Sequence, residues 1–341
     1  MILSPRHDQL IFKHEDGFVS CQQLIGIDLG GTNCRAAIVS SDGAIGRQAQ
    51  IPTAMTAGLD EFLGRLTALC RELEDEPGVA PPSAIGIGTP GLIAPDGTVR
   101  VSPNLPDLNG VPFASRVSEA LGLPVAVVND ANAIAWGERF AGAGRPFASS
   151  LTLTLGTGVG GGLILNGALW EGPDGSGGEA GHIMVEPDGP RCGCGSRGCL
   201  EQYASARGIV QTARRLLAGG GHSVLMTDAP ASLGARRIAE AAGHGDALAL
   251  EAFAEAGRRL GQALGGVINL LNLDGVVIAG GVSGSFNLLQ PALEEELARR
   301  SFVLPAERCR VVPRALGEHA GLIGAARLAF ERHLSAKDPF R

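Results

Sequence analysis

Three cysteines lie close together in the middle of the chain. Cys192, Cys194 and Cys199 form a glycine-rich Cys-x-Cys-x4-Cys run, and His182 lies ten residues before it. One imidazole and three thiolates are the ligand set of a closed tetrahedral zinc site. We therefore expect these four residues to bind a structural Zn²⁺, with a chance grouping of thiols as the alternative. A disulfide is a weaker alternative, because the chain shows no export signal.

Two glycine-rich turns are candidates for phosphate binding. Gly30-Gly31-Thr32-Asn33 and residues 156–162, which include Thr157 and Gly158, each join two apolar segments. Such turns let backbone N–H groups approach an anion, so two of them can hold one polyphosphate between two lobes. No Gly-Lys-Ser/Thr follows either turn, and the next segment is a strand, which excludes a Walker A loop and a Rossmann turn. The alternative is that the glycines serve only the hairpins.

Asp28 lies directly before the first of these turns, at the end of an otherwise apolar segment. A carboxylate repels a bound phosphate unless a cation lies between them. Asp28 is therefore a candidate for the Mg²⁺ side of a nucleotide site, directly or through water. The alternative is an aspartate that caps the turn.

The elements that must position these residues follow from the apolar periodicity. Each half of the chain has a three-stranded meander followed by alternating helices and strands, which implies a mixed sheet flanked by helices. Two such halves around a central cleft make the α/β duplicated fold of actin, Hsp70 and sugar kinases, the actin-like or ribonuclease H-like ATPase fold. The predicted helices are 59–74, 112–121, 131–140, 246–271, 285–300 and 318–333, and the predicted strands outside the first meander (24–50) are 84–88, 125–128, 151–155, 163–165, 275–279 and 309–313.

Length and charge limit the class of protein. The 341 residues are enough for two domains with substantial cores. The net charge of −7, with no extended basic run, argues against a nucleic-acid or anionic-membrane surface. Because no apolar run reaches transmembrane length and the N-terminus is polar, we expect a cytoplasmic protein without a membrane partner.

The motifs, in their order along the chain, resemble those of the ROK family of repressors, open reading frames and sugar kinases. The resemblance extends from about residue 24 to about residue 330 and is most specific in the cysteine run with its Glu-x-Gly-His. The matching segments are Asp28-Leu29-Gly30-Gly31-Thr32-Asn33, Asn129-Asp130-Ala131-Asn132-Ala133, Leu155 with residues 156–162, Glu179-Ala180-Gly181-His182, residues 192–201, and Ala279-Gly280-Gly281-Val282-Ser283.

The resemblance implies an ATP-dependent hexokinase in which Asp130 is the catalytic base. It also implies that His182 faces the sugar with one ring nitrogen and the zinc with the other. The implied sugar-binding residues are Gly91, Asn104, Asn129, Asp130, Glu179, His182 and Glu201, and the implied phosphate and nucleotide contacts are Gly30, Gly31, Thr32, Asn33, Thr157, Gly158 and Gly281.

Residue chemistry agrees with these roles. Asp130 lies where a strand becomes a helix, and it can accept the proton of a sugar hydroxyl as the oxygen attacks the γ-phosphorus. Its alternative role is a helix N-cap. Glu179 alone would be read as a solvated loop carboxylate, and Glu201 as a carboxylate in the first turn of a helix. Glu201 follows Cys199 by two residues, so zinc would fix its position. Because the phosphate-binding turns are remote from the cysteines in sequence, we expect zinc to affect the sugar site much more than the ATP site.

The predicted organisation is a short polar leader (1–23), an N-terminal lobe (24–130 plus 318–341) and a C-terminal lobe (131–317). The first lobe holds the first turn and Asp130, and the second holds the second turn, the zinc site and the adenosine motif. A leader of 23 residues is too short for the winged helix of the family's repressors. A sugar sensor without catalysis would be expected to lack Asp130 or an intact turn. A chaperone-type ATPase has no use for a zinc-anchored sugar pocket.

Glucose is the predicted acceptor, because residues 102–110 and 123–138 look most like bacterial glucokinases of the family. Many relatives have a tryptophan after the Asn104-Leu105 pair, where this chain has Asp107-Leu108. N-acetylmannosamine, N-acetylglucosamine and fructose therefore stay open as acceptors. The family resemblance also suggests a homodimer.

Overall fold

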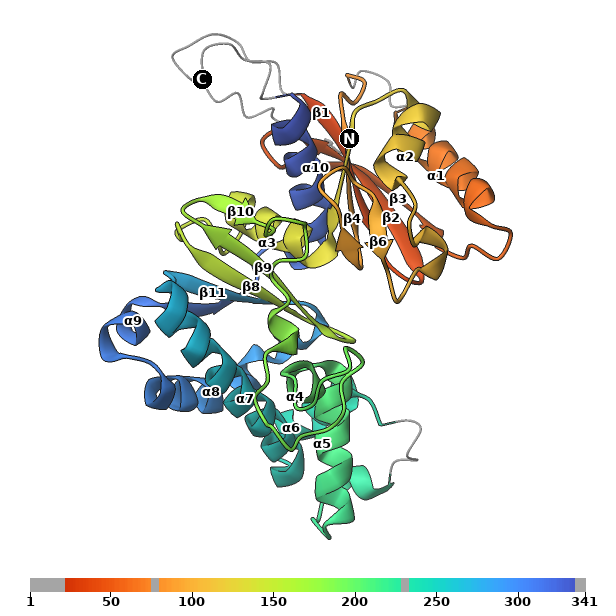
Figure 1. Ribbon diagram of the computed structural model, residues 1–341. Coiled ribbons are helices and arrows are strands. Elements are labelled where there is room, and N and C mark those ends of the chain that lie inside the picture. The colour runs from red at the N-terminus through yellow and green to blue at the C-terminus, as the bar shows by residue number, and fades with distance from the viewer. Residues whose placement is uncertain (1–21, 75–79, 228–232, 335–341) are drawn as a thin grey trace, which may run out of the picture.

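The computed structural model describes residues 22–74, 80–227 and 233–334. Nearly all of the predicted leader (1–23) and the end of the predicted N-terminal lobe (335–341) lie outside the described residues. The described chain folds into two lobes, each a sheet covered by helices (Figure 1). This confirms the two-lobed α/β fold, whereas the lobe boundaries stay a prediction.

The two sheets repeat one topology. The first has the strand order β3-β2-β1-β4-β7, and the second has the order β10-β9-β8-β11-β12. In each, an antiparallel meander continues into parallel strands. The duplication expected from the glycine-rich hairpins is therefore confirmed. The strands are β1 (Gln23–Leu29), β2 (Asn33–Ser40), β3 (Ile45–Pro52), β4 (Ile85–Thr89) and β7 (Val125–Asn129), then β8 (Ser150–Leu155), β9 (Val159–Leu165), β10 (Ala168–Trp170), β11 (Gly275–Ala279) and β12 (Arg310–Pro313), with β5 (Leu92–Ile93) and β6 (Val99–Val101) as a separate pair.

Helices cover both faces of each sheet. In the first lobe, α1 (Leu59–Glu74) and α2 (Phe113–Leu121) pack on one face and α10 (Ala320–His333) on the other. In the second lobe, α7 (Ala247–Leu271) and α8 (Phe286–Arg300) pack on one face, and α3 (Asp130–Ala141) lies on the other. These helices end within two residues of the predicted bounds. The helix expected to begin near Glu201 is α4 (Glu201–Ala204), whereas sequence reasoning gave no counterpart for α5 (Ala206–Ala218), α6 (Ala235–Gly243) and α9 (Val303–Arg308).

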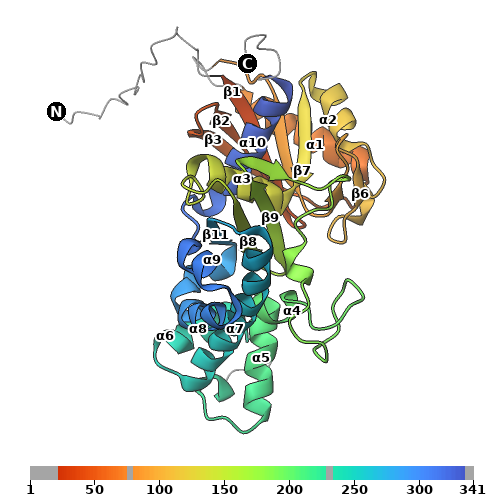
Figure 2. The same ribbon diagram turned by 60° about the vertical axis from the view of Figure 1, so that its left-hand side comes forward.

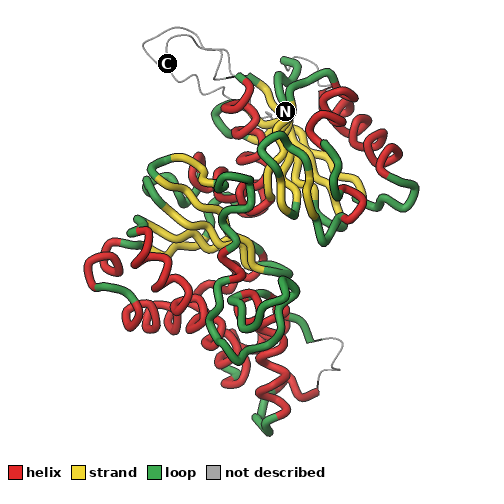
Figure 3. Tube along the Cα trace, in the orientation of Figure 1, coloured by secondary structure: helices red, strands yellow, loops and turns green. Residues whose placement is uncertain are grey.

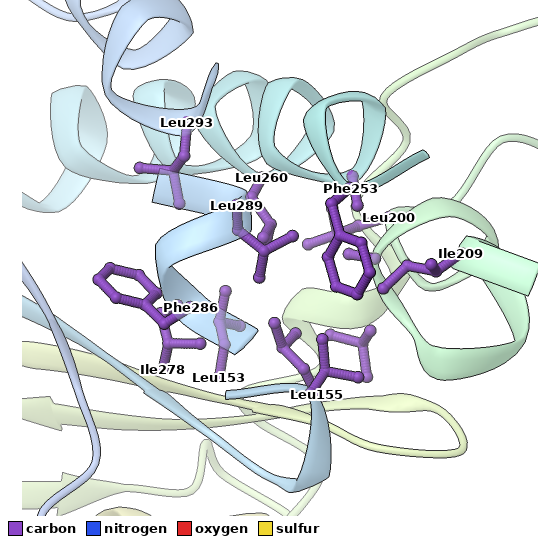
Figure 4. Packing of buried hydrophobic residues seen from close by; sticks show 14 of the residues in the cluster. Leu153, Leu155, Leu200, Ile209, Phe253, Leu260, Ile278, Phe286, Leu289 and Leu293 are labelled. Carbon is purple, nitrogen blue, oxygen red and sulfur yellow. The ribbon is translucent and has the colours of Figure 1, made fainter. Parts of the chain in front are cut away.

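The larger core fills the second lobe. Figure 4 shows Leu153 and Leu155 of β8 on one side, with Leu289 of α8 and Phe253 of α7 opposite them. Each of these side chains is at most 1% exposed. Full burial of such a side chain contributes about 1.5–3 kcal/mol. The second glycine-rich turn, which directly follows β8, is therefore attached to a well-packed sheet.

Helices α3 and α10 cross between the lobes (Figure 2). A Cβ on Gly137 would lie 2.1 Å from the Ala320 carbonyl oxygen, and a Cβ on Gly324 would lie 1.8 Å from the Ala133 carbonyl oxygen. Only glycine permits this approach of two backbones. The chain leaves the first sheet through α3 and returns from β12 into α10 through residues 314–319, which include the short 3₁₀ helix η5 (Gly317–His319).

Residues 171–200, between β10 and α4, are mostly loop (Figure 3). This segment contains the cysteine run and the short 3₁₀ helix η2 (Ala180–His182). Within the described residues, no helix combines the length and the apolar character needed to cross a membrane.

Candidate active site

Asp130 is the first residue of α3, directly after β7. The N-cap of α3 is the neighbouring Asn129, whose side-chain oxygen accepts hydrogen bonds from Ala131 N at 2.9 Å and Asn132 N at 3.3 Å. Asn129 therefore caps the helix, and the Asp130 carboxylate is not needed as the N-cap. Asp130 Oδ1 also accepts a hydrogen bond from Ala131 N at 2.9 Å.

The Asp130 carboxylate is a stronger base than an ordinary aspartate. Burial raises its pKa from 3.8 to about 6, and the charges of Asp28 and Glu179 act in the same direction, against the hydrogen bond from Ala131. A carboxylate with a pKa near neutrality is suited to accept a proton in the transition state. The structure therefore brings Asp28 and Glu179, two other predicted site carboxylates, close enough to influence Asp130.

Asn129 also connects the start of α3 to the loop that contains Gly91, a predicted sugar-binding residue. Its Nδ2 donates a hydrogen bond to the Gly91 carbonyl at 3.0 Å. Gly91 has a φ of 123°, and a Cβ there would lie 2.3 Å from the Val101 carbonyl oxygen, so the turn requires glycine. Two of the predicted sugar-binding residues are thus in direct contact with each other.

The first glycine-rich turn faces the loop that contains Asn104. Gly30 N donates to the Asn33 carbonyl at 3.0 Å, which closes the turn. Thr53, the residue directly after β3, supports the turn because its Oγ1 donates to the Gly30 carbonyl at 2.7 Å. A Cβ on Gly31 would lie 3.6 Å from Asn104. The predicted phosphate-binding turn and the predicted sugar contact are therefore neighbours.

Asp28 is paired with a cation from its own lobe. Arg35 on β2 lies opposite Asp28 on β1 in the sheet register, and its guanidinium contacts Asp28 Oδ2 at 2.5 Å. The same guanidinium contacts Glu318 Oε2 at 2.8 Å. Sequence reasoning missed Arg35, although the short first hairpin places it across from Asp28. The Mg²⁺ role of Asp28 stays a prediction.

The second glycine-rich turn lies against Glu201. Gly156 N donates to the Gly158 carbonyl at 2.9 Å, and Val159 N donates to Glu201 Oε2 at 3.1 Å. A Cβ on Gly158 would lie 2.5 Å from the same carboxylate oxygen. Glu201 therefore links the cysteine loop to the turn. The cysteine loop and the second turn are remote in sequence but adjacent in space. The expectation that zinc affects the sugar site much more than the ATP site therefore loses its basis.

A pocket of about 680 Å³ opens beside the second turn. Thr157 and Gly281 line it, as predicted nucleotide contacts should, whereas Gly158 is not among its lining residues. The far wall comes from α6, which sequence reasoning did not predict. The amphipathic pattern of α6 could have indicated it. The full lining is Gly156, Thr157, Ala206, Ala235, Arg236, Ala239, Glu240, Phe253, Gly281, Val282 and Ser285.

The four predicted metal ligands come together. The ligand atoms of His182, Cys192, Cys194 and Cys199 all lie within 4.8 Å of one another. Cys194 Sγ lies 3.7 Å from Cys199 Sγ, and His182 Nδ1 lies 3.6 Å from Cys192 Sγ. Zn–S bonds of about 2.3 Å in a tetrahedron put sulfur atoms about 3.8 Å apart. The donor types and their separations therefore fit Zn²⁺.

The two ring nitrogens of His182 face different neighbours. Its Nδ1 faces the cysteines, and its Nε2 lies 3.8 Å from Glu179 Oε2. Bound metal on Nδ1 would fix the ring and leave Nε2 toward the sugar side. This arrangement supports the two-sided role predicted for His182.

Comparison with known proteins agrees with this geometry. The sequence profile of the ROK family matches residues 24–332. Among characterised relatives, the glucokinase of Thermotoga maritima is 39% identical, over 91% of this chain and 98% of its own length. The N-acetylmannosamine kinase of Shigella flexneri is 32% identical, over 90% of this chain and 98% of its own.

A solved structure shows the same fold with ligands. A ROK family glucokinase from Streptomyces griseus, crystallised with glucose and AMPPNP, superposes with a TM-score of 0.77 at 35% identity. The match covers 91% of this chain and 99% of the other.

Proposed function

The chain belongs to the ROK family, and we propose that it phosphorylates glucose at the 6-hydroxyl with ATP, using Asp130 as general base. The observation that carries the proposal is the Asp130 carboxylate, which stands at the start of α3 with a pKa raised to about 6. The glucose and AMPPNP of the Streptomyces griseus relative support the choice of substrates.

The proposed reaction is a direct transfer. The Asp130 carboxylate accepts the proton of the glucose 6-hydroxyl while that oxygen attacks the γ-phosphorus of ATP. The new O–P bond forms as the bond from the γ-phosphorus to the bridging oxygen breaks, and ADP leaves with the electron pair. Protonated Asp130 then returns its proton to solvent.

Backbone amides are proposed to hold the phosphates. Gly30, Gly31, Thr32 and Asn33 present the first turn, and Thr157 and Gly158 present the second. The nucleoside would occupy the pocket between α6 and Gly281. A Mg²⁺ ion bound with ATP neutralises phosphate charge, and Asp28 is the residue proposed to hold it, directly or through water.

Sugar recognition is proposed to use both lobes. Asn104 and Asn129 act from the first lobe with Gly91, and Glu179, His182 and Glu201 act from the cysteine loop. Directional hydrogen bonds from carboxylates and amides reject acceptors whose hydroxyls differ in position.

We further propose one structural Zn²⁺ per chain, held by His182, Cys192, Cys194 and Cys199. The carrying observation is the convergence of the four ligand atoms within 4.8 Å. The proposed homodimer rests on family resemblance, and the proposed cytoplasmic location rests on the polar N-terminus and the lengths of the apolar runs in the sequence.

A coupled ADP-release assay with ATP, Mg²⁺ and a panel of hexoses and N-acetylhexosamines tests the function. We expect glucose to give the highest kcat/KM. The similarity to N-acetylmannosamine kinase makes that sugar the second candidate. If no sugar of the panel releases ADP, the enzyme proposal fails and the sugar-sensor alternative replaces it.

A further inference from the structure

Glu138 is a carboxylate in the last turn of α3 that is fully buried, with 0% exposure. Its Oε2 accepts hydrogen bonds from Ala143 N at 2.8 Å and Ala315 N at 3.0 Å, and its Oε1 accepts one from Leu316 N at 3.0 Å. Burial of an ionised carboxylate is costly unless hydrogen bonds compensate for the lost water. Three backbone donors provide that compensation here.

The donors come from the two segments through which the described chain passes between the sheets. Ala143 lies in the outgoing segment between α3 and β8, and Ala315 and Leu316 lie in the returning segment between β12 and α10. The backbone carbonyl of Glu138 also accepts hydrogen bonds from Gly142 N at 3.0 Å and Gly144 N at 2.9 Å. One residue therefore fastens the outgoing segment to the returning segment.

Both fastened segments lead directly to the candidate active site. Helix α3 begins at Asp130, so the base and Glu138 stand on one rigid element. The returning segment continues to Glu318, which binds Arg35 at 2.8 Å, and Arg35 in turn contacts Asp28 at 2.5 Å. A shift at Glu138 would thus reach both site carboxylates of the first lobe.

We propose that Glu138 is a positioning residue, which fastens the two interlobe segments and thereby aligns Asp130 with the second glycine-rich turn. The inference rests on the proposed kinase function. Phosphoryl transfer depends almost entirely on positioning and electrostatic stabilisation. A misplacement of about 1 Å can lower the rate by about 10²-fold.

Glu138→Gln tests the proposal because it keeps the size of the side chain and replaces one acceptor oxygen with an NH₂ donor. We expect kcat per folded enzyme to fall about 10- to 100-fold. The KM for ATP should change by less than about threefold, because the nucleoside pocket lies within the second lobe. Amide hydrogen exchange in peptides containing Ala143 and Ala315–Leu316 should accelerate, while exchange in α7 should not.

Glu296→Gln is the matched control. Glu296 is a similarly buried glutamate on α8, but its ion pairs go to Arg299 and Arg300 of the same helix. We expect its kcat to stay near that of the wild type. An equal loss of kcat in this control would overturn the proposal, because the effect of Glu138→Gln would then be general destabilisation.

Gly142→Ala gives a second route if Glu138→Gln does not fold. A Cβ on Gly142 would lie 2.1 Å from Glu138 Oε2, so the methyl group displaces the carboxylate without replacing it. The same fall in kcat is expected. Faster amide exchange with unchanged kcat would show that Glu138 has only a structural role, which overturns the proposed alignment of Asp130. Unchanged exchange would show that Glu138 does not hold the two segments together. A wild-type protein without kinase activity would instead overturn the proposed function, and the exchange rates alone would then decide whether Glu138 fastens the segments.

Discussion

At the scale of single residues, the site depends on how carboxylates are surrounded. Asp28 forms an ion pair with Arg35, whereas burial, together with the negative charges of Asp28 and Glu179, raises the pKa of Asp130. Asp28 is on β1 and Asp130 directly follows β7, two strands of the first sheet that are separated by β4. The raised pKa supports the proposed proton transfer by Asp130, and a role of Asp28 on the Mg²⁺ side of the site stays a proposal.

Asp130→Asn should abolish most turnover while sugar binding persists. The amide has nearly the same shape and its oxygen can still accept from Ala131 N, but it cannot take a proton. Loss of a general base costs about 10²–10⁴-fold in rate. Steady-state kinetics would measure the loss, and calorimetric titration with glucose would measure the binding. A variant with near-normal kcat would place the base elsewhere.

The pH dependence follows from the same carboxylate. Because the pKa of Asp130 is raised to about 6, kcat/KM should rise with pH through about 6 and then reach a plateau. An aspartate with a raised folded-state pKa favours the folded state while protonated, and that stability is lost as pH rises through the folded-state pKa. Asp130→Asn should therefore raise Tm more at pH 8 than at pH 5. Thermal melts at the two pH values would check this, and an equal effect at both would contradict the raised pKa.

At the scale of elements, the sequence predicts those features that a local residue pattern determines. The cysteine spacing identified a cluster that does converge, and the hairpins identified both glycine-rich turns. Contacts between distant segments have no such local signal. Glu201 against the second turn, and α6 against Gly281, depend on how the lobe closes on itself. Arg35 is intermediate, since its register opposite Asp28 follows from a short hairpin.

Cys194→Ser tests the link between metal and site. We expect metal analysis to find one zinc per chain in the wild type and much less in the variant, with a lower Tm. Because Glu201 follows the cysteines and bonds to Val159 N, the KM for glucose and the KM for ATP should both rise. A rise in the KM for glucose alone would show that the Glu201 contact does not transmit the change. Zinc-free wild-type protein with all thiols reactive would contradict the metal site.

At the scale of the whole molecule, repetition made the fold predictable. Two matching hairpins implied two matching sheets, and the strand orders repeat. Helix ends were predictable where periodicity was strong, as in α1 and α7. The crossing of α3 and α10 was not, because a glycine in a helix pattern does not reveal which backbone lies against it. The requirement for glycine at positions 137 and 324 becomes visible only when the backbone of the opposite helix is known.

Gly324→Ala tests whether this crossing sets both stability and alignment. Its Cβ would lie 1.8 Å from the Ala133 carbonyl oxygen, a backbone atom that cannot move aside alone, so the helices must separate. Overpacking of this kind costs about 1–3 kcal/mol, which urea denaturation would measure. Since Ala133 is one turn from Asp130, kcat should fall as well.

Gly266→Ala is the control, because Gly266 is an exposed residue of α7 with open space around it, and alanine there should stabilise by about 0.5–1 kcal/mol. If Gly324→Ala matched that control in stability and rate, the two helices would not be in the close contact that the structure shows.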